Sequence, residues 1–104
     1  MADPMKIRAA MNGEFTEVKV LMAHPMETGL RKDASSGGVF PAHYISEVSA
    51  TCAGKTVLEG RFSQSVSQNP YLAFRFKGGV KGAKVQVSWV DNKGDKRSDE
   101  ATIA

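Results

Sequence analysis

The fold class is decided by residues 83–94, AKVQVSWVDNKG. Val85, Val87 and Trp89 alternate with polar residues, a spacing that places three apolar side chains on one face of a β-strand. Residues 91–94 then supply a hairpin turn, because Asn and Gly tolerate the backbone conformations that tight turns require. Residues 96–103 return as the last strand. We therefore predict an antiparallel hairpin with one buried face, in which the indole N–H of Trp89 needs an acceptor.

The same period of two recurs along the whole chain, and tight turns such as Asn12-Gly13 separate the segments. No segment has the periodicity of a helix. About seven short strands in a chain of this length predict an all-β, immunoglobulin-like β-sandwich. The predicted strands cover residues 5–11, 15–22, 44–52, 55–62, 71–76, 83–90 and 96–103.

The composition suits one compact domain over residues 1–104. With 104 residues and 41% hydrophobic content the chain can build a single core, and 24% charged residues is close to the globular average. No run of about 18 apolar residues is present, so no transmembrane helix is expected. Residues 1–6 lack an apolar signal core. The single cysteine, Cys52, excludes an internal disulfide. Taken alone, these features favour the cytoplasm.

The formal net charge of +3 does not point to nucleic acid. Basic residues are scattered among acidic ones, whereas nucleic-acid-binding domains concentrate them in a patch or stripe. We predict neither a nucleic acid nor a membrane as a partner.

A long loop, residues 23–40, separates the second and third predicted strands, and loops of this length in compact domains are usually functional or mobile. His24 lies in the loop and His43 follows it, and each histidine is either a structural cap or a partner contact. Met22 and Met26 are either core residues or adaptable contacts; Met26 looks exposed because its neighbours are polar. Arg31 is the best candidate for binding an anionic partner group. The predicted partner-contact residues are therefore Met22, His24, Met26, Arg31 and His43.

Catalytic and metal sites find little support in the sequence. Two histidines, a cysteine and methionines could form a copper site, but no histidine follows Cys52, unlike the late ligand loop of small copper proteins. Cys52 sits in an alternating strand and is expected to be buried and inert. No Gly-x-Ser-x-Gly elbow is present, and residues 78–82 lack the spacing of a phosphate loop. We predict no catalytic residue, no cofactor and no metal.

Several blocks resemble one family, the sulfur-oxidation protein SoxZ. They run in the family's order over nearly the whole chain, from about Lys6 to Ile103, and are specific together rather than singly. The blocks are HPMETG at 24–29, RKD at 31–33, PAH at 41–43, NPYLAF at 69–74, FKGG at 76–79 and WVDNKG at 89–94.

The resemblance implies an immunoglobulin-like sandwich that is not an enzyme. It implies a heterodimer or larger complex with SoxY, which carries sulfur intermediates on a C-terminal cysteine arm during thiosulfate oxidation. It also implies transient contacts with the other Sox enzymes and a periplasmic location reached by export with a signal-bearing SoxY. A domain built to pair leaves an apolar sheet face exposed, so we expect the isolated chain to self-associate or to bind SoxY tightly. The chain ends SDEATIA and has no cysteine arm of its own.

Two other functions remain open from the residues themselves. One is a stand-alone β-sandwich binding module, which needs no partner. The other is a thiol-dependent sulfurtransferase, which would need Cys52 as an exposed, activated thiolate.

Overall fold

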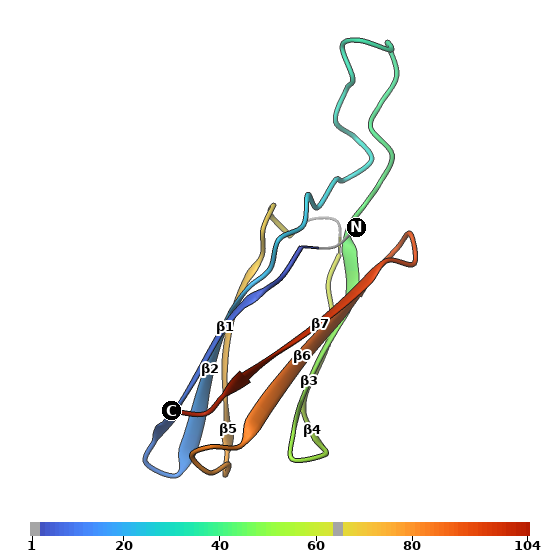
Figure 1. Cartoon of the computed structure of the whole chain (residues 1–104). Helices are drawn as coiled ribbons and strands as arrows, with labels where there is room; N and C mark the ends of the chain where they lie inside the picture. Colours follow the sequence, from blue (N-terminus) through green and yellow to red (C-terminus); the bar gives the residue numbers. More distant parts are fainter. Residues whose placement is uncertain (1–2, 64–65) are drawn as a thin grey trace.

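The computed structural model describes residues 3–63 and 66–104, so residues 1, 2, 64 and 65 of the predicted domain lie outside this description. Its described residues form seven strands in two antiparallel sheets, without a helix, which confirms the all-β sandwich (Figure 1). No helix in the described part of the chain is long and apolar enough to cross a membrane.

The two sheets contain three and four strands. The first has the order β1 (Lys6–Asn12), β2 (Phe15–Leu21), β5 (Tyr71–Lys77), and the second β4 (Lys55–Arg61), β3 (Ile45–Cys52), β6 (Lys84–Asp91), β7 (Lys96–Thr102). Every predicted strand boundary lies within one residue of the observed one, because most strands carry their own alternation and several end at tight turns.

The core lies between the sheets and is built from the alternating residues of β2, β3 and β6. Val85, Val87 and Trp89 all point inward from β6, as the spacing predicted, and Trp89 is only 2% exposed. The His24 and Trp89 rings pack perpendicular to each other, with centroids 5.2 Å apart. The indole Nε1 is buried and has no hydrogen-bond acceptor among the described residues.

Backbone contacts link the two sheets at one end of one side of the sandwich, which we call the closed side, and the opposite side is open. On the closed side Ala9 of β1 forms a bridge with Ile103, and the backbone of Ala104 exchanges hydrogen bonds with Ala9 and Met11 at 2.9 and 3.1 Å. Figure 1 shows the C-terminus beside β1. On the opposite side the sheets end in β4 and β5, and no backbone hydrogen bond joins these two strands among the described residues.

Residues 27–43, which we call the arm, project from one end of the sandwich as a narrow loop (Figure 1). Its two limbs pair at Glu27 with His43 and at Lys32 with Val39. The arm makes the molecule elongated, with principal extents of 53 × 20 × 18 Å.

Gly79, after β5, packs where a side chain has no room. Its φ of +86° lies in the left-handed region, and an added Cβ would clash with Thr16 Oγ1. Thr16 is fully buried, and its hydroxyl is already fixed because it donates to the carbonyl of Gly78 at 2.7 Å. The turn therefore needs glycine at residue 79 for two reasons.

We expect Gly79→Ala to lower the free energy of unfolding by about 2–4 kcal/mol, from backbone strain and the clash together. Gly82→Ala is the matched control, because Gly82 has a φ of +90° but nothing within 4 Å of an added Cβ. The control should lower the free energy of unfolding by only about 1–2 kcal/mol, from backbone strain alone. Urea denaturation measures both, and equal losses would contradict the packing argument.

Candidate functional site

Two histidines meet one carboxylate at the base of the arm. Asp91 Oδ2 lies 3.1 Å from His24 Nε2 and 2.7 Å from His43 Nε2. The Asp91 side chain is fully buried, the His24 side chain nearly so, and the His43 side chain is about one-quarter exposed. We call these three residues the clamp. It joins the end of β2, the start of β3 and the end of β6.

The other oxygen of Asp91 holds the β6–β7 turn. Oδ1 accepts hydrogen bonds from the backbone N–H groups of Lys93 and Asp95, both at 2.9 Å. The backbone N–H of Asp91 donates to the carbonyl of Asp95, which closes the predicted hairpin turn. One buried carboxylate thus fixes a tight turn with one oxygen and the two histidines with the other.

The proton positions at His24 follow from its neighbours. Its Nδ1 accepts a hydrogen bond from the backbone N–H of Met26 at 3.1 Å, so the ring proton of neutral His24 sits on Nε2. Nε2–H then donates to Asp91 Oδ2. The backbone around His24 is held by Asn69, whose Oδ1 accepts from the His24 N–H at 3.0 Å.

The residue after Asp91 ties down the second limb of the arm. Asn92 Oδ1 accepts from the Tyr44 N–H at 2.8 Å, and Asn92 Nδ2 donates to the Ala42 carbonyl at 2.8 Å. The backbones of Glu27 and His43 exchange two further hydrogen bonds. Turn side chains from β6–β7 therefore hold the second limb of the arm at its base, and the backbone pair with His43 holds the first limb.

The clamp shifts the pKa values of two of its members downward. Burial is the largest influence on His24 and lowers its pKa; the hydrogen bond to Asp91 opposes this, and the charge of His43 adds to the lowering. Burial would raise the pKa of Asp91, but hydrogen bonds from His24, His43 and the two turn amides outweigh it and hold that pKa below its usual value. The preferred state is an ionised Asp91 with a neutral His24.

The same three residues are the kind that bind metal ions, and their ligand atoms lie within 4.8 Å of one another. A metal ion on Nε2 would require the proton of His24 to move to Nδ1, where it would face the Met26 N–H. Metal-binding histidines show the opposite arrangement, in which the second ring nitrogen donates a proton. The donor set therefore fits a hydrogen-bonded junction better than a metal centre.

The structure separates the predicted partner-contact residues into two groups. Met22, His24 and Met26 are buried, whereas Arg31 is exposed on the arm and His43 is partly exposed. The expectation that Met26 is exposed is wrong. Met26 has a φ of +50° and is 5% exposed, and its sulfur accepts the Ile45 N–H at 3.3 Å. A role for Arg31 and His43 in partner contact stays a prediction.

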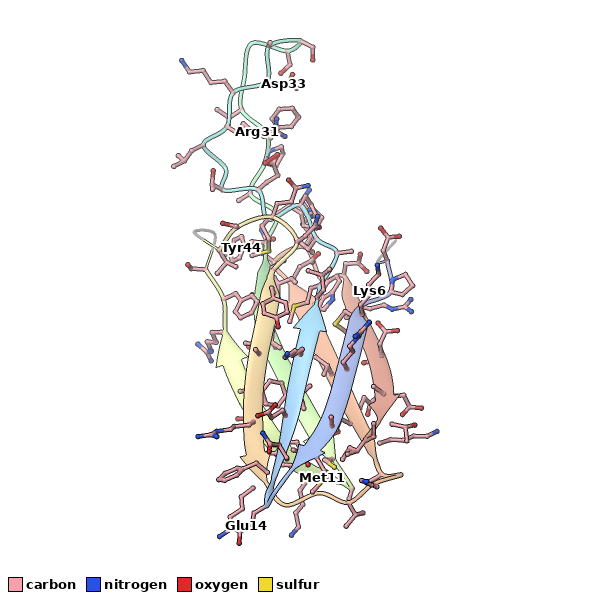
Figure 2. All side chains as sticks on the ribbon, turned by 90° about the vertical axis from the view of Figure 1, so that its left-hand side faces the viewer. Lys6, Met11, Glu14, Arg31, Asp33 and Tyr44 are labelled. Atoms are coloured by element: carbon pink, nitrogen blue, oxygen red, sulfur yellow. The ribbon has the colours of Figure 1, made fainter. Side chains whose placement is uncertain are left out.

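Arg31 also organises the arm. Its guanidinium forms a bidentate ion pair with Glu27 and stacks over the Phe40 ring at 3.8 Å from the centroid. At the tip, Asp33 Oδ1 accepts from the backbone and hydroxyl of Ser35. Figure 2 shows Arg31 and Asp33 beyond the ends of the strands. The hydrogen bond from Arg31 lowers the pKa of Glu27.

The fold and the clamp together define an immunoglobulin-like sandwich with a braced arm. Solved structures with this fold include a superoxide reductase in the oxidized state, with 19% identity, a TM-score of 0.64, and coverage of 99% of this chain and 89% of that one. They also include a superoxide reductase (neelaredoxin) from Archaeoglobus fulgidus, with 22% identity, a TM-score of 0.57, and coverage of 97% and 86%. At these identities the similarity concerns the fold alone.

A family model described as sulphur oxidation protein SoxZ matches residues 5–102. The chain belongs to the SoxZ family, which gives it a role in sulfur oxidation. No match to a curated protein sequence accompanies this assignment.

We expect Asp91→Asn to lower the free energy of unfolding by about 2–4 kcal/mol, because the new amide would place a donor against the Nε2–H groups of two histidines or against the turn amides. Asp95→Asn makes the same chemical change on the same turn without touching the clamp histidines. In urea denaturation, Asp95→Asn should lower the free energy of unfolding by well under half as much as Asp91→Asn. Equal effects would show that the clamp does not stabilise the fold.

We expect stability to fall as the pH falls from 7.5 to 5. The pKa of His24 is lower in the folded state than its ordinary value of 6.5, so the unfolded chain binds the proton more readily and acid favours unfolding. The shifted acidic groups have ordinary values of 3.8 and 4.5 and act at lower pH. Thermal denaturation across this range, with His24→Gln for comparison, measures the effect. A constant or rising melting temperature in the native chain would refute it.

Proposed function

We propose that this chain is the non-catalytic subunit of a SoxYZ sulfur-carrier complex. It pairs with SoxY, which holds sulfur intermediates on a C-terminal cysteine arm during thiosulfate oxidation, and it helps to form the docking surface for the other Sox enzymes. The observation that carries the proposal is the match to the SoxZ family over residues 5–102.

The position of Cys52 supports this division of labour. The residue ends β3, pairs in register with Val85 of β6, and is 6% exposed. A thiol fixed in a sheet cannot move between separate active sites. A thiol on a flexible arm can, and tethering raises its effective concentration at each enzyme visited. The mobile thiol therefore belongs to the partner.

The arm supports a docking role. Pairing between its limbs, the Arg31–Glu27 ion pair and the Phe40 stack preorganise it, so less conformational entropy is lost when a partner binds. It presents Leu30, which is 79% exposed, beside the charged Arg31. We assign Arg31 and the exposed edge of His43 to contacts with Sox enzymes. Met22, His24 and Met26 would support that surface from inside.

Replacing Arg31 with Ala should mainly slow association with at least one Sox enzyme and weaken its salt dependence. Unchanged association with every enzyme would leave the arm without this role.

We also place the complex in the periplasm, exported with a signal-bearing SoxY. Recovery of the chain from the periplasm in the absence of SoxY would contradict co-export.

The pairing itself is tested by producing the chain with SoxY and measuring the mass of the purified complex. We expect the isolated chain to self-associate at micromolar concentration or to bind SoxY tightly, in a heterodimer or a larger assembly containing both chains. A monodisperse monomer that does not bind SoxY would favour a stand-alone binding module.

Cys52→Ala tests whether this chain carries sulfur. The substitution removes one buried sulfur and should cost about 1 kcal/mol of stability, while thiosulfate-dependent turnover of the reconstituted system stays unchanged. Binding to SoxY serves as the control for folding. Loss of turnover in a folded, SoxY-bound variant would support a thiol-dependent sulfurtransferase instead.

A further inference from the structure

On one side of the sandwich, each sheet ends in an edge strand that has no further strand beside it. β4 pairs only with β3, and β5 only with β2, among the described residues. Such edges present unpaired N–H and C=O groups, which another extended chain can bind. On the opposite side, the bridge from Ala9 to Ile103 and the hydrogen bonds of Ala104 occupy part of the β1 edge and link it to the end of β7.

A groove of about 320 Å³ lies at this open side, between the β3–β4 turn and the end of β5. Its walls include Val57, Phe76 and Val80. Val57 and Phe76 are only partly buried although they pack against the core, and Val80 is 67% exposed. The groove is therefore an apolar surface that this chain does not cover by itself.

The open side of the sandwich is predominantly basic. β4 and β5 carry four basic side chains, Lys55, Arg61, Arg75 and Lys77, and one acidic side chain, Glu59. The whole chain has 14 basic and 11 acidic residues, so the remainder carries ten of each. The net charge of +3 thus equals the charge of these two edge strands. Lys55 and Lys77 also border the groove.

We propose that the β4–β5 side is the surface that binds the partner subunit, and that the partner covers it with an extended acidic segment bearing an apolar side chain. The apolar side chain fills the groove, the carboxylates face Lys55 and Lys77, and the backbone of the segment pairs with an edge strand. The identity of the partner as SoxY rests on the proposed function; the surface and its chemistry rest on the edges, the groove and the charge.

Charge reversal tests the surface. The double variant Lys55→Glu/Lys77→Glu should slow association with SoxY by about tenfold or more and weaken its salt dependence. The control, Lys6→Glu/Lys96→Glu, makes the same change in net charge at exposed positions on β1 and β7. It should associate at nearly the native rate. Circular dichroism and the melting temperature show whether each variant is folded.

Hydrogen exchange of the native chain gives a readout that needs no variant. Binding of SoxY should slow exchange in β4 and β5 and leave β7 unchanged. If the native chain binds SoxY but both double variants associate alike, or if β4 and β5 gain no protection, this surface is refuted while the proposed function stands. If the native chain does not bind SoxY at all, both proposals are refuted.

Discussion

The hydrogen bonds accepted by the Asp91 carboxylate are the interactions on which the arm end of the sandwich depends. One oxygen fixes the β6–β7 turn, and the other receives His43, which ends the arm, and His24, which precedes it. The charge is buried, so it is tolerated only because four N–H groups surround it. Removing any one of them leaves the others to satisfy an ion in the core. This dependence explains why the turn, the arm base and the adjacent Trp89 ring form one packed unit.

The fold could be predicted from the sequence because its signals are local. Most strands alternate apolar and polar residues, and β1, β3, β5 and β6 end at or next to Gly or Asn turns, so these boundaries emerge without knowledge of the sheets. The burial of Trp89 and Cys52 follows from the same alternation. Strand order is a different matter, since the pairing of β2 with β5 across some fifty residues leaves no local trace.

The candidate site was predicted only in part. The residue types and the loop single out His24 and His43 as candidates, but nothing in the local pattern indicates that the two rings meet. Asp91 and Asn92 were interpreted only as turn residues, because a hairpin turn already accounts for Asp and Asn there. Met26 was misjudged since polar neighbours suggest exposure, whereas its positive φ is a tertiary feature. The local alternation of apolar and polar residues carries no information about contacts between segments far apart in the sequence.

The bridge between Ala9 and Ile103 has a consequence for assembly size. A sandwich with free edges on both sides could add neighbours indefinitely and grow into a filament. Here Ile103 and Ala104 bond to Ala9 and Met11, so part of the β1 edge is already occupied. A strand added at that edge would have to displace these contacts, whereas one added at β4 or β5 would not. The contacts of Ile103 and Ala104 thus disfavour growth on one side of the sandwich.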